Sequence, residues 1–149
     1  MKRVIQGVAA LALAMGMTVA FAQVTPVGVW KTIDDDGKTE KSLVRIVDAG
    51  GALNGRIETV MDPAKKDAVC DKCDDERKDK KVVGLTILRN VTKDSGDESL
   101  WTGGDILDPN NGKVYKVRLR PVDGGKRLEV RGYVGMPMLG RTQTWLRVE

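Results

Sequence analysis

Apolar and polar residues alternate along most of this chain, and turn residues interrupt the alternation about every ten residues. The clearest segment is 113–122, where Tyr115, Val117 and Leu119 alternate with charged residues. A period of two predicts β-strands that bury one face. The pattern predicts eight strands, over residues 27–33, 41–47, 52–60, 82–91, 99–107, 113–122, 127–135 and 139–148. No segment has a convincing helical period.

The connections between these strands are short, except for one long polar stretch at 62–81. Consecutive strands joined by short turns form an up-and-down antiparallel sheet. Closing eight such strands into a barrel removes the two exposed edges, and glycines inside the strands fit the bends that closure needs. We therefore expect an all-β fold, a small eight-stranded antiparallel up-and-down barrel. A two-sheet sandwich is the alternative, although it usually requires more long connections.

The N-terminal segment differs from the rest of the chain. Lys2 and Arg3 precede an apolar run at 4–19, and residues 20–22 (Ala-Phe-Ala) supply the small residues of a cleavage site. This pattern predicts a signal peptide, residues 1–22, and one mature domain, residues 23–149. No cysteine lies near the cleavage site, and no later stretch is apolar enough to span a membrane. We expect a periplasmic or secreted protein that is not a lipoprotein.

Charge and composition narrow the function. The formal net charge of +4 falls to +2 when Lys2 and Arg3 are removed, which argues against a nucleic-acid partner. The chain has no histidine, so it lacks Ser-His and Cys-His nucleophile pairs and imidazole metal ligands. We found no defensible pair of catalytic carboxylates and no nucleotide-binding loop. We therefore expect no enzymatic activity, no cofactor and no bound metal.

The two cysteines, Cys70 and Cys73, lie three residues apart in the long polar stretch. Zinc would need further ligands, from neighbouring acidic residues or a second chain. A redox pair would need a lowered thiol pKa, which the flanking acidic residues oppose. A disulfide suits an oxidising compartment and the geometry of a β-turn. We expect a disulfide that orders the loop locally and contributes at most about 2 kcal/mol. If the barrel has a mouth, this loop could lie beside it.

Two short motifs resemble those of the lipocalin (calycin) superfamily. Gly28-Val29-Trp30 in the first expected strand is similar to the Gly-x-Trp signature of those proteins. Arg147 in the last strand stands where lipocalins keep an arginine that packs on that tryptophan. The resemblance implies that Gly28, Trp30 and Arg147 close one end of the barrel, through stacking and a cation–π contact.

A second resemblance covers nearly the whole mature chain. The runs WTGGDILDPNNGKVY (101–115), LEVRGYVG (128–135) and LGRTQTWLRV (139–148) are similar to the bacterial family called domain of unknown function 2147. The resemblance implies a small secreted or periplasmic protein with a lipocalin-like barrel. It implies no established activity.

An eight-stranded barrel is just wide enough to be filled by side chains or to hold one small ligand. We expect a carrier of a small apolar or amphipathic molecule. Its candidate lining is apolar and comes from inward strand positions: Ile57, Leu85, Ile87, Tyr115, Val117, Leu119, Leu128 and Val130. Arg56, Arg131 and Arg141 are candidates to contact a polar head group. The alternative is a filled barrel that binds an envelope protein through its outer face or the 62–81 loop.

Overall fold

The computed structural model describes residues 24–149, so the expected signal peptide lies outside the described residues. The described chain forms eight strands and three short 3-10 helices. The strands are β1 (Gly28–Ile33), β2 (Glu40–Ala49), β3 (Ala52–Val60), β4 (Thr86–Lys93), β5 (Trp101–Asp108), β6 (Lys113–Val122), β7 (Arg127–Tyr133) and β8 (Arg141–Arg147). The helices are η1 (Pro63–Lys65), η2 (Asp123–Gly125) and η3 (Pro137–Leu139). No helix among residues 24–149 has the length and apolar composition needed to cross a membrane.

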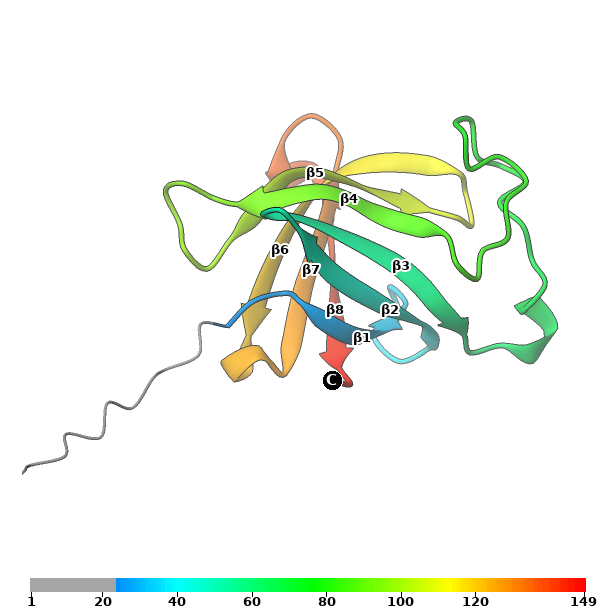
Figure 1. Cartoon of the computed structure of the whole chain (residues 1–149), viewed down its shortest axis with the longest axis horizontal. Helices are drawn as coiled ribbons and strands as arrows, with labels where there is room; N and C mark the ends of the chain where they lie inside the picture. The colour runs from blue at the N-terminus through cyan, green and yellow to red at the C-terminus, as the bar shows by residue number, and fades with distance from the viewer. Residues whose placement is uncertain (1–23) are drawn as a thin grey trace, which may run out of the picture.

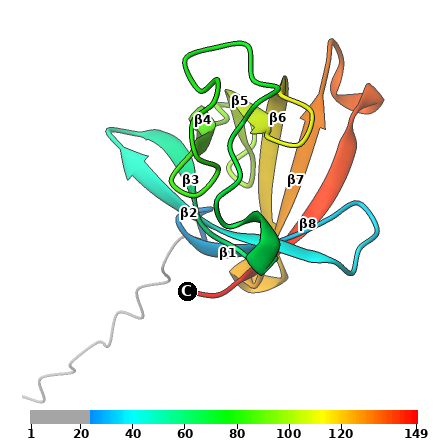
Figure 2. The same cartoon turned by 90° about the vertical axis from the view of Figure 1, so that its right-hand side faces the viewer.

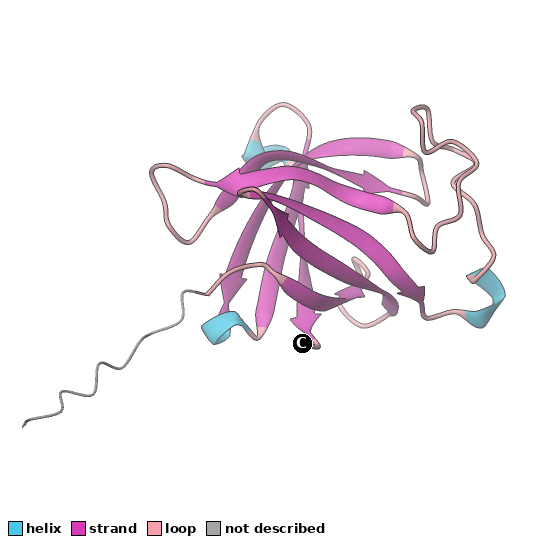
Figure 3. Ribbon diagram, viewed as in Figure 1, coloured by secondary structure: helices cyan, strands magenta, loops and turns pink. Residues whose placement is uncertain are grey.

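The strands form one closed barrel in sequence order, each antiparallel to its neighbours, with β8 returning to β1 (Figures 1 and 3). The expected all-β, eight-stranded up-and-down barrel is therefore confirmed, and the sandwich alternative is excluded. Because the topology is up-and-down, the β1–β2, β3–β4, β5–β6 and β7–β8 connections lie at the same end. We call this end the mouth.

The pairing that closes the barrel is the shortest. Strand β1 pairs with β8 at only two register positions, Trp30 with Arg147 and Lys31 with Leu146. Strands β2 and β3, by contrast, pair from Ser42 with Val60 to Ala49 with Ala52. The β1–β8 ladder therefore closes the barrel far from the mouth and ends before reaching it.

Strand β4 begins at Thr86 rather than at residue 82, where the sequence pattern placed it. Residues 82–85 form a turn, in which the amide of Leu85 donates to the carbonyl of Val82 and Gly84 has a φ of +94°. This turn still pairs with β3, because Ile57 donates to Leu85 and Gly84 donates to Ile57. The long connection thus ends only where β4 starts.

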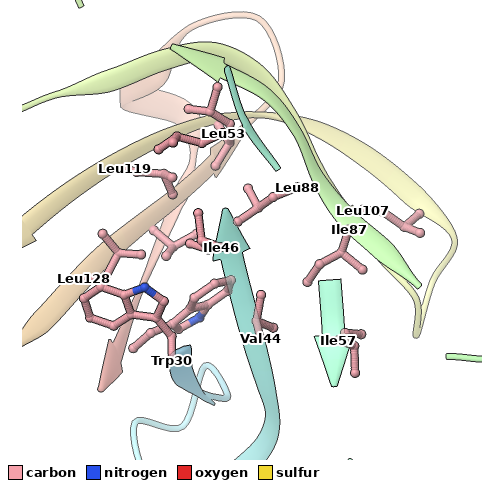
Figure 4. Close-up of a cluster of buried hydrophobic side chains, with 14 of the residues drawn as sticks. Trp30, Val44, Ile46, Leu53, Ile57, Ile87, Leu88, Leu107, Leu119 and Leu128 are labelled. Atoms are coloured by element: carbon pink, nitrogen blue, oxygen red, sulfur yellow. The ribbon is translucent and has the colours of Figure 1, made fainter. Parts of the chain in front are cut away.

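Side chains from all eight strands fill the barrel interior unequally. Figure 4 shows Trp30, Ile46, Leu119 and Leu128 gathered toward one end, while Ile57, Ile87 and Leu107 lie toward the other. The first four are almost entirely buried and belong to the hydrophobic core. The end opposite the mouth is therefore solidly packed, and we call it the closed end.

Candidate ligand-binding site

The closed end is sealed by the contact between Trp30 and Arg147. The Arg147 guanidinium carbon lies 4.2 Å from the centroid of the Trp30 ring, and the indole Nε1 donates to the carbonyl of Pro26 at 2.8 Å. Arg147 also donates to three backbone carbonyls, those of Thr25, Val27 and Gly125. Burial lowers the pKa of the Arg147 side chain below its ordinary value, although arginine remains protonated.

Gly28 completes this seal. It has a φ of +141°, and a Cβ there would collide with the carbonyl oxygen of Glu149 and with the Arg147 guanidinium. Glycine is the residue that tolerates both this backbone conformation and this close approach. The three residues of the Gly-x-Trp and arginine motifs therefore meet at one place.

The mouth end of the barrel contains a cavity of about 570 Å³. Its floor is apolar and combines side chains of five strands: Ile57, Ile87, Ile106, Val130 and Trp145. Leu107 and Val60 add to this surface. Cavities of 300–1,000 Å³ with an apolar lining are typical of small-molecule sites.

Charged side chains surround the opening. The acidic ones are Asp34, Asp35, Glu40, Asp62, Asp71 and Asp108, and the basic ones are Lys41, Lys65, Lys72 and Arg141. Both signs are therefore present at the mouth. A ligand with an apolar body and a polar end would fit with the polar end outward.

A hydroxyl pair supplies a polar point on the cavity wall. Thr32 of β1 and Ser42 of β2 are buried and line the cavity, and their hydroxyl oxygens lie 2.8 Å apart. Each hydroxyl can donate and accept, so one group can also hydrogen-bond to a ligand.

Side chains bridge the gap between β1 and β8 at the mouth. Asp35, in the β1–β2 turn, accepts from Arg141 Nη1 at 2.6 Å and from Gln143 Nε2 at 2.9 Å. Gln143 in turn accepts from the indole Nε1 of Trp145, at 3.1 Å, on the cavity floor. This chain of hydrogen bonds joins the turn to β8 beyond the last β1–β8 backbone pair.

The disulfide-bonded loop forms one wall of the mouth. Cys70 and Cys73 are bonded, with their Cα atoms 5.4 Å apart, which confirms the expected disulfide. Both are almost fully buried, whereas Val69, Asp71 and Lys72 line the cavity. Figure 2 shows this loop, in green, beside the β5–β6 turn. The disulfide is thus packed into the protein and holds the wall in shape.

Gly112 of the β5–β6 turn makes this packing possible. A Cβ on Gly112 would overlap the carbonyl of Lys72, and the residue has a φ of +72°. The backbones of the turn and the loop therefore touch directly. The Cys70 sulfur also lies 3.9 Å from the carbonyl oxygen of Pro109 in the same turn.

An ionic network fixes the other side of the loop to the barrel. The buried Arg77 donates to Asp75, with Nη2 2.6 Å from Oδ2, and to the carbonyl of Thr86 at 2.9 Å. Arg89 of β4 joins Asp105 of β5 at 3.1 Å. The hydrogen bond from Arg77 lowers the pKa of Asp75 from 3.8 to about 2. Asp75 is therefore ionised over a wide pH range.

The expected lining residues divide into two groups. Ile57, Ile87, Tyr115 and Val130 line the cavity. Leu85, Val117, Leu119 and Leu128 do not line it. All four of these are buried in the core, so their assignment to the cavity lining was wrong. Alternation identifies the inward face of a strand but does not give the height of a residue along the barrel.

The three candidate arginines also differ. Arg141 lies at the mouth and is bound to Asp35. Arg56 is exposed and lies outside the cavity lining, because its neighbour Ile57 points inward. Arg131 lies on the outer face and donates to the Pro137 carbonyl and the Thr142 hydroxyl. Arg56 and Arg131 are therefore not head-group contacts in this cavity.

Several cavity residues escaped the sequence analysis. Gln143 and Trp145 share the inward face of β8 with Arg141, so alternation alone could have identified them. Ile106 was missed because the pairing of β5 with β6 is irregular between Trp101 and Gly104, so strict alternation does not give the inward face of β5. Thr32 and Ser42 are polar, so an apolar pattern did not select them.

A closed eight-stranded barrel, sealed by tryptophan and arginine at one end and hollow at the other, is a lipocalin-like fold. The solved structure of protein HP1028 from the human pathogen Helicobacter pylori, which belongs to the lipocalin family, is similar to this chain, with a TM-score of 0.72. That similarity covers 85% of this chain and 84% of the other at 21% identity, and so concerns the fold.

The family profile described as "Uncharacterized protein conserved in bacteria (DUF2147)" matches residues 28–147. The chain belongs to this family, and the expected membership is confirmed. A comparison with curated proteins gives no significant match.

Proposed function

We propose that this protein is an exported, non-enzymatic binding protein for a small amphipathic molecule. The observation that carries the proposal is the cavity of about 570 Å³, which has an apolar floor and a charged mouth. The apolar part of the ligand would contact Ile57, Ile87 and Val130, and its polar end would lie near Arg141 and Lys72. A filled barrel, the premise of the alternative interaction module, does not agree with this cavity.

Export is supported by the sequence of residues 1–22 and by the disulfide, which is typical of oxidising compartments. We expect the protein recovered from the periplasm or medium to begin at Gln23 and to carry no lipid. N-terminal sequencing and intact mass measure both properties. A chain that retains residues 1–22 in the cytoplasm would contradict export and leave ligand binding to be judged separately.

Ligand carriage is tested on the exported protein without assumptions about ligand identity. Native mass spectrometry should show a bound small molecule that solvent extraction removes. The fluorescent amphipathic probe anilinonaphthalene sulfonate should then bind the emptied cavity and be displaced by the extract. Absence of an extractable molecule together with absence of probe binding would refute the proposal.

Filling the cavity should abolish this binding. Gly132 lines the cavity, and a Cβ there would lie 3.5 Å from the Cβ of Tyr115, an ordinary contact. Gly132→Leu should therefore extend into the cavity, and we expect probe affinity to fall at least ~10-fold.

Gly132→Ala is the matched control, because it changes the same backbone position but leaves most of the volume free. It should bind the probe within ~3-fold of the original protein. Circular dichroism should show that both variants fold. Equal probe affinities for the two variants would mean that the probe binds elsewhere.

A further inference from the structure

The loop between β7 and β8 exposes four large apolar side chains. Val134 is 68% exposed, Met136 56%, Met138 74% and Leu139 73%. Every other large apolar side chain among the described residues has a smaller exposed fraction. We call these four residues the apolar loop. Clustered apolar exposure of this kind marks a surface that binds a protein or a membrane.

The loop has a defined conformation. The 3-10 helix η3 closes it, with Leu139 donating to Met136 and Gly140 donating to Pro137. From β7, the Arg131 Nε donates to the Pro137 carbonyl at 2.6 Å. The apolar side chains are therefore held outward by a structured turn, which reduces the ordering cost of binding.

The apolar loop lies beside the mouth. Gly132 and Arg141, which flank it on β7 and β8, both line the cavity. In Figures 1 and 2 the loop, in orange, projects away from the barrel at the end of these two strands. A surface that buried this loop would be brought next to the cavity opening.

Basic residues lie on the outer face of β6 and β7, and β7 is the strand that leads into the apolar loop. Arg118 of β6 is the register partner of Arg131 of β7, and Lys116 is the partner of Tyr133. In the part of the chain that the structure describes, none of these three basic residues forms an ion pair. Asp105, opposite Lys116 on β5, is bonded to Arg89 instead. Arg118 and Arg131 are like charges directly opposite each other, which is unfavourable. Asp97 is near enough to Arg118 for that cation to lower the pKa of its carboxyl, but its ion pair is with Arg120.

We propose that the apolar loop and these basic residues dock the barrel onto an anionic lipid bilayer, with the mouth next to the membrane. Apolar side chains that enter the acyl boundary and cations that meet anionic head groups are the two components of peripheral membrane binding. Protein interfaces are depleted in lysine and in charge at their core, whereas basic residues next to an apolar loop complement the anionic head groups of a bilayer. The proposal extends the proposed function by assigning the membrane as the place where the ligand is taken up or released.

Vesicle co-sedimentation tests this docking with residues 23–149, which contain every strand and the core of the barrel. The protein should sediment with vesicles of phosphatidylglycerol and phosphatidylethanolamine, and much less with phosphatidylcholine alone. The double substitution Met138→Ser/Leu139→Ser should weaken binding at least ~10-fold. Lys116→Gln and Arg118→Gln should each weaken it ~5-fold at low salt.

Val47→Ser is the matched control, because Val47 is 47% exposed on β2 near the closed end. It should leave vesicle binding unchanged. Absence of binding to anionic vesicles would overturn the proposal, as would an equal loss with Val47→Ser. Binding that is unaffected by the loop substitutions would also overturn it.

The outcome is separable from that of the proposed function. Gly132→Leu fills the cavity but leaves the apolar loop in place, so it should sediment with vesicles as the original protein does. If the original protein binds the probe but does not sediment with anionic vesicles, the membrane inference is refuted and the proposed function is not.

Discussion

Replacing Trp30 with alanine is expected to lower the free energy of unfolding by about 3–5 kcal/mol. The Trp30 side chain is fully buried at the closed end, where its ring lies against Arg147 and its Nε1 donates to Pro26. The substitution removes a tryptophan of the core and leaves a cavity next to a partly buried cation. Urea denaturation followed by circular dichroism measures the change.

Arg147→Ala should also destabilise the protein, because three carbonyls lose their donor. Since Trp30 and Arg147 contact each other, the effects of the two substitutions on the free energy of unfolding should not be additive. A double-mutant cycle should give a coupling of about 1 kcal/mol or more. Leu146→Ala is the control, because Leu146 is the neighbouring residue but is exposed. A loss below about 1 kcal/mol for Trp30→Ala would show that the closed end is not sealed by this residue.

The barrel could be predicted from the sequence because its determinants are local. Alternation in segments such as 113–122 fixes which side chains face inward, and the turn residues fix where strands end. The motif residues Gly28, Trp30 and Arg147 meet in the structure as the lipocalin resemblance implied. The start of β4 was placed four residues too early, because the apolar residues of the 82–85 turn imitate a strand.

The position of the cavity could not be predicted in the same way. Leu119 and Val130 both face inward, pair with each other across β6 and β7 and belong to the hydrophobic core, yet only Val130 lines the cavity. Which of two paired inward side chains reaches the cavity depends on how the registers of several strands combine around the barrel, and alternation along one strand does not carry that information. The prediction that Arg56 and Arg131 contact a polar head group in the cavity failed for a simpler reason. Each neighbours an inward apolar residue and so points outward.

The disulfide-bonded loop depends on contacts that are distant in sequence. Its position follows from Gly112, 40 residues from the Lys72 backbone that it touches, and from the salt bridges of Asp75 and Arg89. No local pattern encodes these contacts. The sequence predicted that the loop was tied by a disulfide, whereas only the structure shows the ionic network that attaches it to β4 and β5.

Breaking this network by Asp75→Asn is expected to destabilise the loop by about 2–3 kcal/mol at neutral pH. The Arg77 side chain is only 6% exposed, so loss of the carboxylate leaves a buried cation without its counter-charge. Removing one partner of a buried ion pair costs more than the pair contributes, and partial exposure of Asp75 reduces the figure somewhat. The loop should open locally, since its attachment depends on this pair.

Amide hydrogen exchange measures the opening at two informative positions. The amide of Cys70 donates to Lys80, and the amide of Val82 donates to Ala68, within the loop. Both should exchange faster in Asp75→Asn, whereas amides of β6 should not change. Asp74→Asn is the matched control, because Asp74 is the adjacent carboxylate and is exposed. Equal exchange in the two variants would contradict a specific role of Asp75.

The pH dependence separates charge from packing. The pKa of Asp75 is lowered from 3.8 to about 2, so its contribution is complete above 3.8 and is lost as the pH falls through 2. The difference between Asp75→Asn and the original protein should therefore shrink over this interval. A difference that stays constant down to pH 2 would mean that the carboxylate acts by shape rather than by charge.

The substitution Asp75→Asn should also weaken probe binding, because Val69, Asp71 and Lys72 belong to the same loop and line the cavity.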